Sequence, residues 1–172
     1  FKDEIEKNRE QISQVYTYED IRKNREQGKM SALLSLEEGA IFEKSPEQLR
    51  QLYDQGVRAA TFTWNYENEL GYPNYQGNPF HEHPWSRGEE RGLKKKGIEV
   101  LEQMEELGVI PDVSHLSDGG FWDVARYSKK PFLATHSNAR GAAPEAARNL
   151  TDPMIRTLAE RGGVMGLNYC VS

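Results

Sequence analysis

Two histidines and one glutamate are the residues of this chain whose types and positions could bind a metal ion. His115 and His136 lie 21 positions apart, and each directly follows a serine or threonine at the end of a short apolar run. Glu37 follows a third run of the same kind. Neutral imidazoles and a carboxylate are suitable ligands for zinc, and a carboxylate can also bridge two ions. Two ions held close together would activate a hydroxide and polarise a carbonyl group.

These residues need a scaffold that brings the ends of separate runs together, and a parallel β-sheet does so. Short apolar runs bounded by Gly or Pro predict buried parallel strands, whose carboxyl ends lie at one edge of the sheet. The offset of 21 residues also leaves room for a crossover helix between neighbouring strands. Five runs fit this pattern: residues 32–36, 57–63, 109–113, 131–135 and 163–167.

Helical segments alternate with these runs, so we predict an α/β fold with a parallel sheet, either doubly wound or part of an eight-stranded (β/α)8 barrel. Five strands cannot close that barrel, which takes about 250 residues. We therefore expect the 172 residues to be part of a longer chain. Four crossover helices are expected, beginning at the capping box of Ser45 and Gln48, near Leu93, at Ser117 and at Asp152-Pro153.

We expect one partial barrel domain over residues 1–172. Residues 1–30 are charge-balanced and helix-prone, with a capping-box pattern at 17–20, so they are predicted to form a helical lead-in. Residues 31–172 then supply the βα units. The segment 65–91 is rich in Gly, Pro, Asn and aromatic residues. Because long irregular segments inside compact domains are usually functional, we predict an active-site loop there.

Composition excludes several kinds of partner. A net charge of −5 without a basic stripe argues against nucleic acid. No run approaches the roughly 20 apolar residues of a membrane-spanning helix, so we expect no membrane segment in this chain. The single cysteine, Cys170, excludes an internal disulfide framework and suits a reducing compartment such as the cytoplasm.

Each candidate ligand also has a purely structural explanation. Glu37 could be an ordinary acidic residue at the start of a loop, and a single histidine is more often a hydrogen-bonded structural residue than a ligand. The matched strand-end contexts of His115 and His136 favour metal binding. The His-Glu-His sequence at residues 81–83 also has the spacing of a metal clamp. The prolines near it favour a surface lid instead.

Several motifs along the chain together resemble one known family. In their order and spacing they are similar to those of the membrane dipeptidase (renal dipeptidase) family of zinc peptidases, in the form of its bacterial members. The resemblance extends from about residue 31 to residue 169. The motifs are Leu36-Glu37-Glu38-Gly39, Thr63-Trp64-Asn65, Gly92-Leu93 with Gly97, Asp112-Val113-Ser114-His115-Leu116-Ser117-Asp118, Thr135-His136-Ser137-Asn138-Ala139-Arg140 and Arg148-Asn149.

The resemblance implies a TIM barrel of the metal-dependent hydrolase type. Its implied activity is the hydrolysis of dipeptides, including those with a C-terminal D-residue, at a centre of two zinc ions. By motif, Glu37 is the catalytic carboxylate that bridges the ions, and His115 and His136 hold the second ion. Arg148 pairs with the free carboxylate of the dipeptide, a role that suits its planar guanidinium. Trp64 takes part in substrate binding, where animal members have a histidine.

Other interpretations stay open beside this one. The family's first zinc is held by an upstream His-x-Asp, and an aspartate near the C-terminus transfers a proton; the 172 residues contain neither motif. A metal hydrolase of lactones or phosphoesters and a catalytically inactive homologue are the alternative functions. Arg148 could instead cap a helix or pair with Glu145. The expected partners are a dipeptide substrate and a second copy of the chain in a homodimer, in the cytoplasm of a bacterium.

Overall fold

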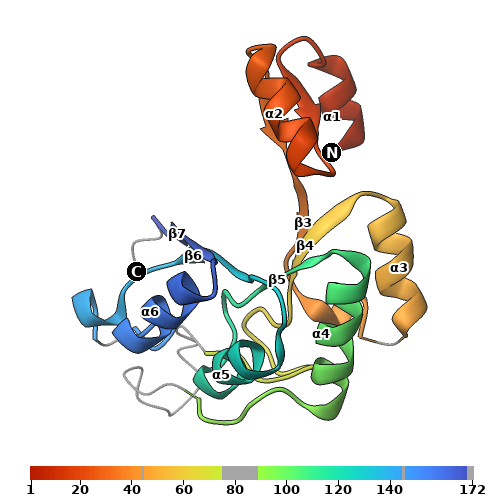
Figure 1. Ribbon diagram of the computed structural model, residues 1–172. Coiled ribbons are helices and arrows are strands. Elements are labelled where there is room, and N and C mark those ends of the chain that lie inside the picture. Colours follow the sequence, from red (N-terminus) through yellow and green to blue (C-terminus); the bar gives the residue numbers. More distant parts are fainter. Residues whose placement is uncertain (44, 75–88, 145, 170–172) are drawn as a thin grey trace.

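Five parallel strands form the sheet that carries the candidate ligands (Figure 1). In this computed structural model, which describes residues 1–43, 45–74, 89–144 and 146–169, the strands lie side by side in chain order. A doubly wound sheet reverses its strand order midway, whereas a barrel adds each strand beside the last. The topology is therefore that of part of a barrel. The strands are β3 (Leu34–Leu36), β4 (Val57–Thr61), β5 (Ile110–Asp112), β6 (Leu133–Ser137) and β7 (Val164–Leu167).

The five predicted strands and four predicted crossover helices are confirmed, with shifted ends. Two short 3-10 helices, η1 (Gly39–Ile41) and η2 (Arg140–Ala142), precede the first and last crossover helix. The helices cover the outer face of the sheet, as in a barrel (Figure 1). They are α3 (Pro46–Asp54), α4 (Lys95–Leu107), α5 (Asp118–Tyr127) and α6 (Asp152–Glu160).

Local capping explains where these helices begin and end. The hydroxyl of Ser45 accepts a hydrogen bond from Gln48 N, and Gln48 Oε1 accepts one from Ser45 N at 3.2 Å, which completes the predicted capping box. Ser117 caps α5 by accepting from Gly120 N at 2.9 Å. Helix α4 ends at Gly108, whose φ of +83° lies in the left-handed region that glycine adopts without strain.

The hydrophobic core lies between the sheet and these helices. Four phenylalanines from different parts of the chain, Phe42, Phe62, Phe121 and Phe132, are at most 1% exposed. The rings of Phe121 and Phe132 meet edge to face with their centroids 5.7 Å apart. Full burial of one such side chain stabilises a fold by roughly 1.5–3 kcal/mol. The core therefore fixes the strands, and through them the residues that follow each strand.

The N-terminal lead-in is not entirely helical as predicted. It contains α1 (Lys2–Lys7) and α2 (Tyr18–Glu26), and the capping box of Thr17 and Asp20 is present. The residues between them form strand β1 (Ile12–Gln14), which pairs in parallel with β2 (Met30–Ala32). Ile12 and nearby Val15 supply the apolar, β-branched residues that favour a strand here. The charge-rich composition of the segment concealed this short strand.

The first predicted strand, residues 32–36, is divided at Leu33. Its first part belongs to β2 and pairs with β1, while its second part is β3 and pairs with β4. The small unit of α1, β1, α2 and β2 stands apart from the barrel segment in Figure 1. Arg58 of β4 connects the two parts, because its guanidinium lies 5.2 Å from the Tyr16 ring and its Nε donates to Tyr16 O.

The predicted active-site loop is described only at its two ends. The end at residues 65–74 contacts the turn after β5, since Asn74 N donates to His115 O at 2.8 Å. Residues 81–83 lie outside the described residues, as do Glu145 and Cys170. None of the helices in the described part of the chain is long and apolar enough to span a bilayer.

Candidate metal centre

Glu37, His115 and His136 converge at the carboxyl edge of the sheet. Glu37 directly follows β3, His115 lies three residues beyond β5, and His136 lies in the last part of β6. Glu37 Oε1 is 3.0 Å from the Nε2 atom of each histidine, and the two Nε2 atoms are 2.9 Å apart. Among the described residues, no other group of three or more His, Cys, Asp and Glu side chains is close enough to hold a metal ion.

The exposed fraction of the three side chains increases from one side of the centre to the other. The His115 side chain is 11% exposed, that of His136 is 33% exposed and that of Glu37 is 51% exposed. The histidines therefore approach from the sheet, and Glu37 lies on the less covered side of the centre in this part of the barrel.

Backbone strain is concentrated beside these ligands. In the described part of the chain, only His115 and Glu38 are non-glycine residues with positive φ, at +70° and +89°. Such conformations cost about 1–3 kcal/mol each and persist only where the surroundings enforce them. The hydrogen bond from Asn74 N to His115 O helps to enforce the turn at His115. The strained turns direct Glu37 and the His115 ring toward each other.

Glu38 stabilises the neighbouring turns and takes no part in the ligand group. Its Oε1 accepts hydrogen bonds from Ala40 N at 2.9 Å and from Asn68 Nδ2 at 2.7 Å, and its Oε2 accepts one from Trp64 N at 3.1 Å. At Gly39 an added Cβ would lie 2.3 Å from Phe62 O, so only glycine fits. The two adjacent glutamates thus have different roles, because the backbone turn directs their side chains to different partners.

The His115 ring is neutral, and Asn65 fixes the position of its hydrogen. Burial first, and then the charges of Arg148 and His136, lower the pKa of His115 to about 3. Nδ1 lies 3.1 Å from Asn65 Oδ1, an atom that only accepts, so Nδ1 carries the hydrogen. Nε2 keeps its lone pair toward Glu37. Sequence reasoning gave Asn65 no role, although its place directly after a predicted strand was a signal.

The donor set fits a metal ion. His115 Nε2 carries no hydrogen and an ionised carboxylate carries none, yet Nε2 and Glu37 Oε1 are 3.0 Å apart. His136 could offer at most one hydrogen, to only one of these two acceptors. A divalent cation removes this mismatch, because it attracts all three atoms at once. One carboxylate oxygen and two imidazole nitrogens are ligands of zinc and of several other divalent ions.

Arg148 lies behind His136, held against β6. Its Nη1 donates to Ser137 Oγ at 3.0 Å and its Nη2 donates to His136 O at 2.9 Å. The residue is 4% exposed, and its buried Nε has no hydrogen-bond partner among the described residues. Burial lowers the pKa of Arg148 to about 10, although the charges of Asp112 and Glu37 raise it, so it stays cationic at neutral pH. Its contact with a substrate carboxylate stays a prediction.

Trp64 borders the open side of the centre. Its side chain is 40% exposed, and its ring meets Tyr66 edge to face with the centroids 5.8 Å apart. The Trp64 and His115 ring centroids are 6.3 Å apart. The structure therefore places this predicted substrate-binding residue beside the predicted ligands, where two aromatic rings could contact a substrate side chain.

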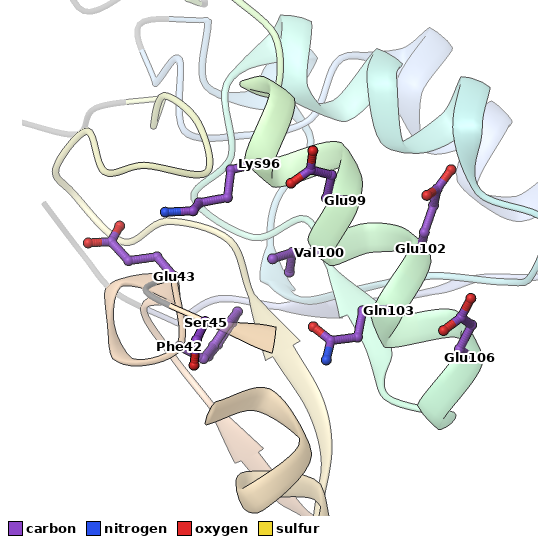
Figure 2. Close-up of a pocket in the computed structure, with 9 residues that line it drawn as sticks. All are labelled: Phe42, Glu43, Ser45, Lys96, Glu99, Val100, Glu102, Gln103 and Glu106. Carbon is purple, nitrogen blue, oxygen red and sulfur yellow. The ribbon is translucent and has the colours of Figure 1, made fainter. Parts of the chain in front are cut away.

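A cavity of about 300 Å³ lies elsewhere, between α4 and the residues that follow η1, namely Phe42, Glu43 and Ser45 (Figure 2). Figure 2 shows that Glu43, Glu99, Glu102 and Glu106 surround it, with Lys96 at one side. None of the three candidate ligands lines it. The cavity is thus separate from the candidate metal centre, and we assign it no role in that chemistry.

Comparison with known proteins identifies relatives over most of the chain. The sequence model of the family described as "Membrane dipeptidase (Peptidase family M19)" matches residues 1–172. A metallopeptidase from Rhodobacter sphaeroides, solved with a phosphinate mimic of the dipeptide L-Ala-D-Ala, is 30% identical with a TM-score of 0.82. The match covers 94% of this chain and 44% of that chain. The probable dipeptidase PvdM from Pseudomonas aeruginosa is 27% identical with a TM-score of 0.81, over 95% of this chain and 40% of that chain.

A curated protein sequence also matches most of this chain with only part of its own length. An uncharacterised protein encoded in the pqqA 5′ region of Klebsiella pneumoniae is 34% identical over 150 residues, which are 87% of this chain and 53% of that protein. The chain therefore spans about half the length of the relatives it matches. This coverage agrees with a five-stranded sheet that is part of a (β/α)8 barrel.

Proposed function

Because the chain belongs to the membrane dipeptidase family, we propose that the whole protein is a zinc-dependent dipeptidase. The observation that carries the proposal is the convergence of Glu37 Oε1, His115 Nε2 and His136 Nε2 within 3.0 Å of one another. When bound, zinc lowers the pKa of water toward neutrality and polarises the scissile carbonyl group. The two histidines would hold one ion, and Glu37 would bridge it to a second.

The neutral state of His115 supports this assignment. A histidine must offer a free lone pair to bind a metal, and the low pKa of His115 keeps its ring unprotonated at neutral pH. Asn65 holds the Nδ1 hydrogen, so Nε2 is the ligating atom. Glu37 is half exposed and has a second oxygen, Oε2, which leaves it free to bridge.

We propose that the substrates are dipeptides, including those that end in a D-residue. The relative from Rhodobacter sphaeroides was solved with a mimic of L-Ala-D-Ala, which supports this class. Arg148 places a cationic guanidinium directly behind His136, and we assign the substrate carboxylate to this charge. Trp64 and Tyr66 form an aromatic wall for a substrate side chain. A dipeptide has its free carboxylate one residue from the scissile bond, so the Arg148 contact would select short substrates.

The test uses the full-length protein and the variants Glu37→Gln and His136→Ala. We expect both to lose hydrolysis of L,L- and L,D-dipeptides while circular dichroism shows an unchanged fold. Glu102→Gln is the matched control, because Glu102 is an exposed glutamate on α4 beside the separate cavity. Full dipeptidase activity in either variant would reject the assigned roles. Hydrolysis of lactones or phosphoesters in place of dipeptides would support a different barrel hydrolase.

A further inference from the structure

We propose that Asp112 and Thr135 are positioning residues that set the hydrogen and the orientation of the His136 ring. The inference rests on the proposed metal-binding role of His136. It concerns three side chains at the carboxyl ends of β5 and β6, connected in the order Asp112, Thr135, His136. Neither Asp112 nor Thr135 contacts the candidate ligand atoms directly in the described structure, so both act through the ring.

Asp112 is a buried acceptor that joins the two strands. It is 4% exposed, and its Oδ1 accepts hydrogen bonds from Ser114 N at 3.0 Å and from Thr135 N at 3.1 Å. Its Oδ2 accepts the hydrogen of the Thr135 hydroxyl. An ionised carboxylate has no hydrogen of its own, so all of these partners must be donors. The side chain thereby adds to a short backbone pairing between β5 and β6, in which Asp112 lies opposite Leu133 and Val113 N donates to Leu133 O at 2.8 Å.

Thr135 transmits this arrangement to the imidazole. A hydroxyl has one hydrogen, and in Thr135 that hydrogen is directed to Asp112. Thr135 Oγ1 also lies 2.8 Å from His136 Nδ1, so at this contact the hydroxyl oxygen must accept. Nδ1 therefore carries the ring hydrogen, and Nε2 keeps the lone pair that faces Glu37 and His115.

Other hydrogen bonds hold the backbone of His136. Thr135 therefore controls only the orientation of the ring. His136 N donates to Ser114 Oγ at 3.1 Å, and His136 O accepts from Arg148 Nη2 at 2.9 Å. His115 obtains the same ring state from a different residue, Asn65. Partners of this kind that hold the second nitrogen of a ligating histidine typically change metal affinity by about 10–100-fold.

The experiment measures zinc affinity of the full-length protein by competition with a chromophoric chelator. We expect Thr135→Val, which keeps the shape and removes the hydroxyl, to weaken zinc binding by about 10–100-fold. Thr135→Ser restores the hydroxyl and should bind within about threefold of the original protein, since Oγ can make the same two contacts. The d–d absorption bands of the cobalt-loaded protein should change in Thr135→Val and return in Thr135→Ser.

One control and one substitute variant keep the result interpretable. Thr157→Val changes a threonine on α6, away from the centre, and should leave zinc affinity unchanged. If Thr135→Val does not fold, Thr135→Ala serves in its place. Equal zinc affinity and equal cobalt spectra in the original protein and the hydroxyl-free variant would overturn the inference, as would an original protein that binds no zinc. Normal zinc binding without dipeptide hydrolysis would reject the proposed function and leave this inference intact.

Discussion

Two polar clusters of this molecule, at opposite edges of the sheet, show how differently polar side chains can be used. At the carboxyl edge, Glu37, His115 and His136 bring acceptor atoms to within 3.0 Å of one another. At the other edge, Glu105 of α4 meets the loop that leads into β6, where Ser128 Oγ donates to Glu105 Oε1 at 2.6 Å and Lys130 N donates at 2.9 Å.

The difference lies in the balance of donors and acceptors. Around Glu105 the named acceptors meet donors, since Oε1 accepts from Lys129 N at 2.8 Å and the Glu105 carbonyl oxygen accepts from Lys130 Nζ at 2.5 Å. Around Glu37 the acceptors outnumber the donors. A matched cluster stabilises the fold by itself, whereas an unmatched one needs a ligand. In barrels of this kind the carboxyl edge carries function and the other edge carries stability.

The largest expected effect is a loss of activity, which mutation of the cluster at the carboxyl edge should cause. His136→Ala should lower dipeptide hydrolysis of the full-length protein by at least about 1,000-fold, because catalytic metal chemistry contributes several kcal/mol to the barrier. Its unfolding free energy without metal should change by less than about 1 kcal/mol, because the ring is partly exposed and faces other acceptors. Steady-state kinetics and urea denaturation in a chelator measure the two quantities. A large loss of metal-free stability would contradict the comparison.

The reverse pattern is expected for the second cluster. Glu105→Ala removes the acceptor of Lys129 N–H and leaves Lys130 N–H with only the longer bond to Ser128 Oγ at 3.4 Å, which should cost about 1–3 kcal/mol of unfolding free energy. Zinc affinity of the folded protein should not change. Urea denaturation and chelator competition test both points, with Glu102→Ala on the exposed face of α4 as the control. An effect of Glu105→Ala on zinc affinity would show that the two edges are coupled.

Acid should weaken the second cluster. Burial raises the pKa of Glu105, but hydrogen bonds from Ser128, Lys130 and Lys129 and the charge of Lys130 outweigh it, so the pKa lies below its usual range. A lowered pKa gives stability that is present above the unfolded-state value, about 4.3, and is lost as the pH falls through the folded-state value. Unfolding free energies measured from pH 6 to pH 3 should therefore fall less in Glu105→Gln than in the original protein. Identical slopes would contradict this.

The smallest effect is expected at the rim of the metal centre. Trp64→Ala should raise KM for dipeptides with large side chains by up to about tenfold and change kcat less, because in the proposed role the ring contacts the substrate side chain and supplies no metal ligand. The backbone bond from Trp64 N to Glu38 survives the change. A panel of dipeptides with small and large side chains measures the difference. Equal loss for both kinds of side chain would show that Trp64 has a structural role.

Much of the fold was predictable because its signals are local. The capping box at Ser45 and the cap at Ser117 mark helix starts, and the apolar runs around them mark the strands. The convergence of His115 and His136 was also predictable, since residues at the carboxyl ends of neighbouring parallel strands lie at one edge of the sheet. Strand β1 was missed because it contains few apolar residues and pairs with β2 only across the intervening helix α2.

The finer organisation of the centre was not predictable for a physical reason. Adjacent Glu37 and Glu38 have the same chemistry, so the family resemblance selected Glu37 and the residue pattern alone did not; the positive φ of Glu38 lies in the turn that separates their roles. Asn65 reaches the His115 ring from 50 positions away, and Asp112 reaches Thr135 from 23 positions away. Such contacts depend on the exact register of β4, β5 and β6, which a run of apolar residues locates only to within a few positions.

The most direct test of the account is anomalous diffraction at the zinc absorption edge from crystals of the zinc-loaded full-length protein. We predict an anomalous peak in contact with Glu37 Oε1, His115 Nε2 and His136 Nε2, and no zinc at the Glu105 cluster. A zinc-loaded crystal with no peak between these three side chains, or with zinc bound only elsewhere on the protein, would contradict the central claim.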